Sequence, residues 1–200
     1  GGIPIVNAIN NGLNANNISK FMGIFNGTSN FILSKMTHEQ TTFKDALEEA
    51  QRLGFAEADP TDDVEGVDAA RKVVITSYLS FNQVIKLNDV KSVGISDITL
   101  ADINAASALN YKIKSIGKGT YENGYVNASV EPTLIHKNHQ LAAVENEYNA
   151  IYVIGDAVGD TMFYGKGAGS LATGSAVVSD LLNVALFFES NLHTLDRKSV

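Results

Sequence analysis

The dipeptide Asn123-Gly124 is the feature that most constrains the fold, because it joins two segments with the pattern of β-strands. Residues 112–121 and 125–132 flank it and are rich in β-branched and aromatic side chains. An Asn-Gly pair between two such segments predicts a tight turn that makes the strands antiparallel neighbours. Further short strands are predicted at residues 19–25, 92–95, 141–144, 150–156 and 160–164, with a short apolar strand or approach segment at residues 3–8.

The first half of the chain is dominated by helical patterns. Thr42 is a good N-cap for a helix over residues 43–53, and Gly54 follows that helix at the position where left-handed backbone is common. Further helices are expected at residues 31–36, 67–81, 99–109 and 170–190. Helices followed by antiparallel strands indicate an α+β fold with a mixed, largely antiparallel sheet covered by helices on one face.

The overall composition excludes several classes of partner. The net charge is −7 and no basic stripe with interleaved aromatic residues occurs, which argues against nucleic acid. The chain has no cysteine, so it has neither disulfides nor thiolate metal sites, and a cytoplasmic location fits. No apolar run approaches the roughly 20 residues that span a bilayer, so no membrane contact is expected.

The ends of the chain suggest a fragment of a longer protein. It opens on Gly1-Gly2 before an apolar segment, as an internal loop would. We expect a main domain over residues 1–160 and a glycine loop with a helix over 161–190. A linker is expected over 191–200.

Residues 54–72 (GFAEADPTDDVEGVDAARK) carry the strongest chemical signal. An acidic loop precedes a helix on which Asp68 and Lys72 stand one turn apart, on the same face. Such a group suits a small cationic substrate and a proton transfer. The alternative is an acidic surface loop followed by an ordinary helix ion pair.

Two other motifs are weaker. The loop over residues 165–169 has the spacing G-x-G-x-G rather than that of a dinucleotide fingerprint, so a plain turn is favoured over an anion site. Asn26, Gly27 and Thr28 could hold an anion or a nicotinamide carboxamide, and could equally be a helix cap. His136 and His139 lack a third ligand, which argues against zinc.

Four segments resemble homoserine dehydrogenase, in the same order and over nearly the whole chain. They are residues 1–5 (GGIPI), 23–33 (GIFNGTSNFIL), 48–72 (EEAQRLGFAEADPTDDVEGVDAARK) and 164–169 (YGKGAG). The resemblance implies NAD or NADP as cofactor and hydride transfer between L-homoserine and L-aspartate 4-semialdehyde, in aspartate-family amino-acid biosynthesis. It also implies that the family's N-terminal dinucleotide-binding domain is absent here, with the C-terminal helix expected to pack on that domain. Residues 1–160 would then be the family's catalytic, substrate-binding and dimerisation domain.

The resemblance also implies roles for individual residues. Lys72 is the acid/base, Glu57 and Asp68 hold the substrate ammonium group, and Asp63 lies in the same site. Gly54 and Gly169 lie against the nicotinamide cofactor, to which we also assign Asn26, Gly27 and Thr28. Gly1 and Ile3 match backbone ligands of a monovalent cation such as sodium.

The chemistry agrees with this assignment. An acidic pocket selects substrates that carry an ammonium group, and a lysine can stabilise the charge that develops on an aldehyde oxygen as hydride arrives. We expect a homodimer, because the second face of the sheet lacks covering helices, and no activity without the missing domain. The alternatives are a related dehydrogenase acting on another semialdehyde and a dimerisation module without catalysis. The sequence leaves NAD and NADP equally open.

Overall fold

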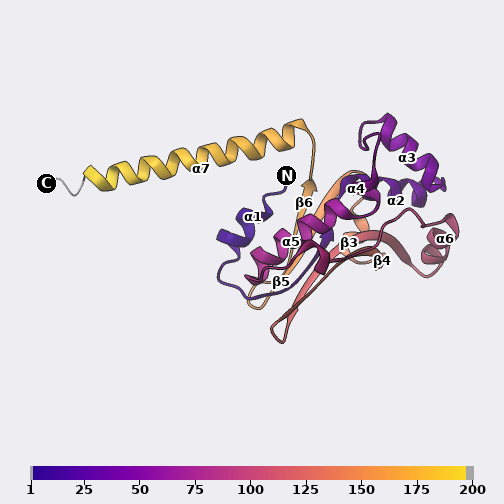
Figure 1. Ribbon diagram of the computed structural model, residues 1–200, viewed down its shortest axis with the longest axis horizontal. Coiled ribbons are helices and arrows are strands. Elements are labelled where there is room, and N and C mark those ends of the chain that lie inside the picture. Colours follow the sequence, from indigo (N-terminus) through magenta and orange to yellow (C-terminus); the bar gives the residue numbers. More distant parts are fainter. Residues whose placement is uncertain (1, 197–200) are drawn as a thin grey trace.

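The computed structural model describes residues 2–196, which form an α+β body and a long C-terminal helix that extends from it (Figure 1). In chain order the elements are α1 (Ile5–Asn7), η1 (Ala8–Gly12), β1 (Ile18–Ile24), α2 (Gly27–Glu39), α3 (Phe43–Arg52), α4 (Thr61–Val64), α5 (Val67–Phe81), η2 (Leu87–Asp89), β2 (Lys91–Ser92), α6 (Leu100–Ala108), β3 (Tyr111–Glu122), β4 (Tyr125–His136), η3 (Gln140–Ala143), β5 (Tyr148–Gly155), β6 (Gly159–Lys166) and α7 (Ser170–Asp196).

The sheet has six strands in the order β2-β4-β3-β1-β5-β6. Only the pair β2 and β4 is parallel, and the other neighbours are antiparallel. The turn between β3 and β4 is formed by Asn123 and Gly124, with φ angles of 53° and 83°. Both angles lie in the left-handed region that a type I′ turn requires. The α+β class, the largely antiparallel sheet and the hairpin predicted from sequence are therefore confirmed.

Helix α5 covers one face of the sheet, where it packs against β1, β3 and β4. Phe21, Phe25, Val73 and Phe81 are buried in this interface. Gly117 on β3 makes the close approach possible, since a Cβ there would lie 2.6 Å from the Phe25 ring and 2.7 Å from Val73. This packing fixes the position of α5, which carries Asp68 and Lys72.

A second cluster joins α2, α3 and α6, with Ile113 of β3 among its buried members. Helix α3 is capped as predicted, because the Thr42 side chain accepts a hydrogen bond from the backbone N–H of Asp45. Helix α2 begins earlier than predicted, at Gly27, because the Asn26 side chain accepts a hydrogen bond from the backbone N–H of Ser29 and so caps it.

The face of the sheet opposite α5 carries a third cluster. Ile24, Ile116 and Ala150 are buried there against Leu141 and Val144, which belong to the segment around η3. Farther from that segment the apolar side chains Met22, Ile154 and Met162 are only partly buried. This part of the face is covered by no helix among the described residues.

Residues 3–8 were predicted as a strand or approach segment, and a strand is wrong. The segment contains α1 and runs on into η1. Ile5, Ile9 and Leu13 lie four residues apart and pack into the same cluster as α5. A spacing of four residues fits one face of a helix as well as one face of a strand, so the sequence pattern alone did not decide between them.

Two other predicted strands differ from the structure. Residues 141–144 are not a strand but mostly the 3₁₀ turn η3, in which the His139 side chain accepts a hydrogen bond from the backbone N–H of Leu141. The segment lies on the sheet and buries its apolar side chains without joining the ladder. At residues 92–95 the strand ends at Ser92. The backbone N–H of Val93 still donates to the Val130 carbonyl, but that of Ile95 donates to the Val64 carbonyl beside the acidic loop.

Helix α7 lies outside the core, and its apolar residues up to Phe188, such as Leu171, Leu181 and Leu186, are exposed (Figure 1). Residues Ser170–Phe188 are long and apolar enough to cross a membrane by length and composition, and none of that stretch is buried. The expectation that no apolar run approaches the length of a membrane span is thus wrong. The mean hydropathy of this stretch stays high although it contains Asp180 and several small polar residues. A single such helix is weak evidence for a membrane.

The domain boundaries expected at residues 160 and 190 both fall inside an element of the structure. Strand β6 runs across residue 160, and α7 continues past residue 190.

Candidate functional site

Asp68 and Lys72 form the ion pair that their spacing predicts. The Lys72 Nζ lies 2.6 Å from Asp68 Oδ2 and also donates to the backbone carbonyl of Phe25, at 3.1 Å. The side chains are 49% and 30% exposed, respectively. Because the carbonyl of Phe25 follows directly after β1, the lysine ammonium is aimed at the junction between β1 and α2 rather than out into solvent.

Asn26 connects the carboxylates of the acidic loop to this pair. Its side-chain N–H₂ donates to Asp63 Oδ1 at 2.6 Å and to Asp68 Oδ2 at 2.9 Å, while its oxygen caps α2. The residue is 6% exposed. Every polar group of the Asn26 amide is thereby used, which fixes both aspartates relative to the start of α2.

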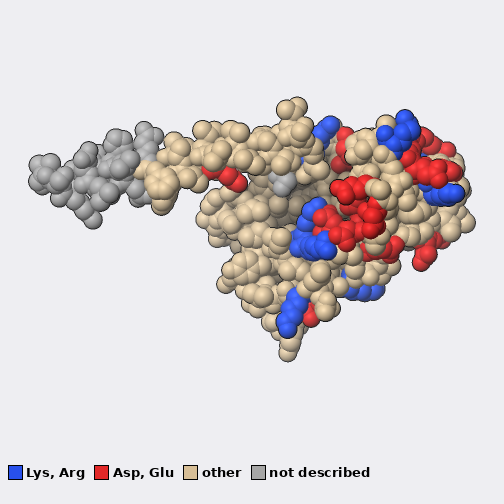
Figure 2. Space-filling view, turned by 45° about the horizontal axis from the view of Figure 1, so that its top comes forward, with Lys and Arg blue, Asp and Glu red and all other residues tan. Residues whose placement is uncertain are grey.

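The other predicted substrate and loop residues lie on the segments that carry this cluster or directly precede it in the chain. Among the described residues Glu57 has no side-chain hydrogen bond or ion pair, and it lies exposed in the loop between α3 and α4. Thr28 donates from its hydroxyl to the Phe55 carbonyl at 2.6 Å, which ties α2 to that loop. Asp62 pairs with Arg71 of α5. Figure 2 shows Asp and Glu side chains gathered beside Lys and Arg on this face of the molecule.

The glycines assigned to the cofactor have backbone suited to close contact. Gly54 and Gly169 have φ angles of 79° and 109°, and nothing lies within 4 Å of where a Cβ would be. Gly27 differs, since a Cβ there would lie 2.7 Å from the Glu147 carbonyl. The first two glycines leave open backbone, whereas Gly27 allows α2 to start against the segment before β5.

A cavity of about 200 Å³ lies next to Lys72, between α1, α5 and the strands β1 and β5. Its walls are mostly apolar, and polar side chains are contributed by Lys72, Thr76 and Asn149. The Thr76 hydroxyl is already used, because it donates to the Lys72 carbonyl at 2.8 Å. Asn149 was not predicted; its only sequence signal is an amide inside the otherwise apolar strand YNAIYVIG.

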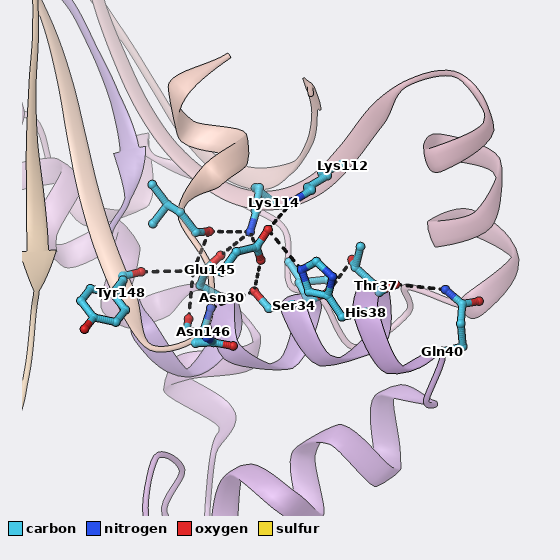
Figure 3. A network of polar contacts seen from close by, with 12 residues as sticks. Asn30, Ser34, Thr37, His38, Gln40, Lys112, Lys114, Glu145, Asn146 and Tyr148 are labelled. Carbon is cyan, nitrogen blue, oxygen red and sulfur yellow. Dashed lines mark hydrogen bonds and ion pairs between the residues drawn. The ribbon is translucent and has the colours of Figure 1, made fainter. Parts of the chain in front are cut away.

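A buried ionic network lies behind the site, centred on Lys114 and Glu145 (Figure 3). The Lys114 side chain is 2% exposed, and its Nζ donates to Asn30 Oδ1, the Val144 carbonyl and Glu145 Oε2 at 3.1, 2.6 and 3.1 Å. Asn30, on the first turn of α2, donates to the carbonyls of residues 144, 146 and 148. The network therefore fastens the segment before β5 to the helix that begins at the site.

The charges of this network shift the pKa values of its members. Burial lowers the pKa of Lys114 to about 8, against the opposing effect of Glu145. For Glu145, burial acts to raise the pKa, but Lys114, Lys112 and Ser34 outweigh it and bring the pKa down to about 2. The sequence did not predict this network, because its residues come from three separate parts of the chain.

The structure thus brings Asn26, Asp63, Asp68 and Lys72 together, with Thr28 beside them. Asn26, assigned to the cofactor from sequence, contacts the aspartates. Gly1 lies outside the described residues, and the Ile3 carbonyl accepts a hydrogen bond from the Ile5 backbone at 2.8 Å. No group of three or more His, Cys, Asp or Glu that could hold a metal ion occurs in the described part of the chain.

Comparison with known proteins identifies the family. The homoserine dehydrogenase family model matches residues 4–182. Homoserine dehydrogenase of Bacillus subtilis is 53% identical over 92% of this chain. A crystal structure of Staphylococcus aureus homoserine dehydrogenase is 88% identical, with a TM-score of 0.83 over 86% of the chain. A hyperthermophilic archaeal homoserine dehydrogenase mutant, described in complex with NADPH, is 29% identical, with a TM-score of 0.77 over 92% of the chain.

The chain spans only part of each relative, namely 42% of the Bacillus subtilis protein, 44% of the Staphylococcus aureus chain and 53% of the archaeal chain. The family model nevertheless extends over nearly all of it, from the segment before α1 into α7. The chain therefore belongs to the homoserine dehydrogenase family.

Proposed function

We propose that the full-length protein containing this chain is an NAD- or NADP-dependent homoserine dehydrogenase. It would interconvert L-aspartate 4-semialdehyde and L-homoserine. This chain would supply the substrate-binding and acid/base residues, and a dinucleotide-binding domain outside it would supply most cofactor contacts. Membership of the family supports the reaction class.

The observation that carries the proposal is the cluster of Lys72, Asp68, Asp63 and Asn26. A carboxylate pair held by one amide can receive the substrate ammonium group through charge-assisted hydrogen bonds. Glu57 lies exposed in the loop between α3 and α4 and has no competing partner among the described residues, so its carboxylate is free to complete that contact.

Lys72 is suited to the proton transfer. Its Nζ is anchored by Asp68 and the Phe25 carbonyl, which leaves one N–H for the substrate oxygen. In the direction of reduction this N–H stabilises negative charge on the oxygen and delivers a proton to it. In the direction of oxidation the neutral amine of Lys72 accepts the hydroxyl proton. The negative charge of Asp68 must then be stabilised by another group, for example by the hydrogen bond from the Asn26 amide.

The residues present fit a nicotinamide cofactor. The apolar cavity beside Lys72 matches a flat ring, and the open backbone of Gly54 and Gly169 allows close contact. Gly27 and Thr28 would border the ring from the start of α2. When bound, the cofactor supplies or accepts the hydride. The archaeal relative was described with NADPH, and this chain carries no dinucleotide fingerprint from which a choice between NAD and NADP could be read.

Three further statements remain predictions. A homodimer is supported by the partly buried Met22, Ile154 and Met162 on the face opposite α5. A role of α7 in packing on the dinucleotide-binding domain is supported by its exposed apolar residues. The cytoplasmic location and the monovalent-cation site at Gly1 and Ile3 rest on composition and resemblance, and no step of the reaction is assigned to the cation.

The proposal is tested by expressing the full-length protein and following nicotinamide absorbance at 340 nm, the wavelength of the reduced ring, with L-homoserine as substrate. Homoserine-dependent reduction of NAD or NADP is expected. D-homoserine and L-threonine serve as control substrates. Turnover of a different hydroxy amino acid in preference to L-homoserine would favour the related-dehydrogenase alternative, and no turnover of any would overturn the proposal.

A further inference from the structure

Asn149, the second residue of β5, has an amide that no described residue binds. The residue is only 8% exposed, yet its side chain makes no hydrogen bond within the described part of the chain. Among the described residues the fully buried side-chain polar atoms without a partner are the hydroxyls of Ser77 and Ser80, so the Asn149 amide remains accessible from the cavity beside Lys72, which its side chain lines. An accessible, unpaired amide in a mostly apolar cavity wall is suited to bind a ligand.

Two glycines make room for this amide. A Cβ on Gly167 would lie 2.7 Å from the Asn149 side-chain carbon, and a Cβ on Gly27 would lie 3.3 Å from its oxygen. Gly167 belongs to the glycine loop before α7, and Gly27 begins α2. The amide is thus held between two backbone segments that already border the proposed site, and it has little freedom to turn elsewhere.

The surroundings of the amide indicate what it binds. The cavity wall is apolar at Ile5, Ile75, Leu79 and Ile151. This wall suits a flat aromatic ring, and a single neutral amide at its edge suits a ring that carries a carboxamide. An amide offers one donor side and one acceptor side, which match the oxygen and the N–H₂ of a carboxamide. The charged groups of the amino-acid substrate are instead matched by the carboxylates around Asn26.

We propose that Asn149 binds the carboxamide of the nicotinamide ring and so orients the ring beside Lys72. This proposal rests on the proposed function and adds a positioning residue to it. The Asn149 oxygen accepts from the carboxamide N–H₂, and its own N–H₂ donates to the carboxamide oxygen. The network of Lys114, Glu145 and Asn30 supports this role from behind, because it fixes the segment that leads into β5.

The test is a double-mutant cycle between protein and cofactor, measured as equilibrium binding in the full-length protein. The dissociation constants of the oxidised dinucleotide and of its 3-acetylpyridine analogue are determined by calorimetry. The analogue replaces the carboxamide N–H₂ by a methyl group. In Asn149→Ala the preference for the natural dinucleotide should shrink about threefold to tenfold relative to wild type, as expected for one hydrogen bond.

Asn149→Asp is the second variant, since it keeps the shape and the accepting oxygen. This variant should retain the preference for the natural dinucleotide over the analogue, although it binds both dinucleotides more weakly. Asn138→Ala, in the exposed turn after β4, is the matched control and should leave both dissociation constants unchanged. Thermal unfolding of each variant checks that the fold is intact.

An unchanged preference in a folded Asn149→Ala variant would overturn the proposal. So would a raised KM for L-homoserine with unchanged dinucleotide binding, because the amide would then serve the substrate. Failure of the proposed function would be seen separately, as absence of homoserine turnover by the wild-type protein, while the binding cycle would still report on Asn149.

Discussion

At the scale of single residues, Lys72 is distinguished by its anchoring. Its ammonium is held by one carboxylate and one backbone carbonyl, at 2.6 and 3.1 Å. An ordinary exposed helix ion pair has only the carboxylate, as in Lys44 and Glu48 of α3, which are 3.9 Å apart. The additional carbonyl favours a positioned acid/base over a solvated pair.

We predict that Lys72→Ala in the full-length enzyme lowers kcat about 100-fold or more, the span usual for a general acid/base. Steady-state kinetics with L-homoserine give the value. Lys44→Ala is the control and should be unaffected, since its pair lies on the exposed face of α3. A near-normal kcat with only a raised KM would assign Lys72 to binding instead.

The carboxylates should act on the substrate and not on the cofactor. We predict that Glu57→Gln and Asp68→Asn each weaken L-homoserine binding by roughly 1.5–3 kcal/mol, the range for hydrogen bonds to charged groups. Dinucleotide affinity, measured by calorimetry, should change little. A parallel loss of dinucleotide affinity would mean that the loop before α5 had collapsed.

At the scale of elements, the segment between η3 and β5 depends on the buried network. The Glu145 carboxylate forms ion pairs with Lys114 and Lys112 and accepts a hydrogen bond from the Ser34 hydroxyl. Its Oε1 atom is also 3.3 Å from His38 Nε2. Removing one partner of such a buried pair leaves the other charge without compensation. The consequence should reach the site, since Asn30 and Asn149 lie on the two elements that the network joins.

We predict that Glu145→Gln lowers the free energy of unfolding by about 3 kcal/mol at neutral pH. The pKa of Glu145 is about 2 in the folded chain, below its ordinary 4.5. The stability from its ionised form is therefore present above pH 4.5 and lost as the pH falls toward 2. The difference between wild type and variant should shrink over that range in urea unfolding.

Glu39→Gln provides the control for this experiment, because Glu39 pairs with Lys35 at the surface, with its side chain 55% exposed. Its effect should stay within about 0.5 kcal/mol. Equal effects of the two substitutions at all pH values would show that the Glu145 network adds nothing specific.

At the scale of the whole molecule, two apolar surfaces are open: the sheet face with Met22, Ile154 and Met162, and the length of α7. Surfaces of this kind are usually covered in the working protein. We assign the first to a second copy and the second to the dinucleotide-binding domain.

We predict that the full-length protein is a homodimer by light scattering and that Met162→Lys shifts it to monomer, because a charge would be buried in the interface. Val84→Lys, at a residue that is 84% exposed beyond α5, should remain dimeric. A wild-type monomer would contradict the assignment of the sheet face.

We also predict that this chain expressed by itself gives no homoserine-dependent nicotinamide reduction, because it lacks a dinucleotide fingerprint. The same absorbance assay, with the full-length enzyme as positive control, measures this. Turnover above background would mean that these 200 residues suffice for cofactor binding.

The sequence by itself determined what depends on neighbours along the chain. Helix α5 has the predicted bounds, and its Asp68–Lys72 pair follows from helical spacing. The cap at Thr42 and the turn at Asn123-Gly124 depend on a few adjacent residues. The short helix α1 and the turn η3 were misjudged, because a few apolar residues fit either the helical or the strand period until packing selects one.

Only the tertiary structure placed Asn26 between Asp63 and Asp68, about 40 residues away along the chain. It also brought Lys114 to Glu145, and it placed Asn149 between Gly27 and Gly167. Such contacts join segments that are distant in sequence, and the sheet and its packed helices set their distances.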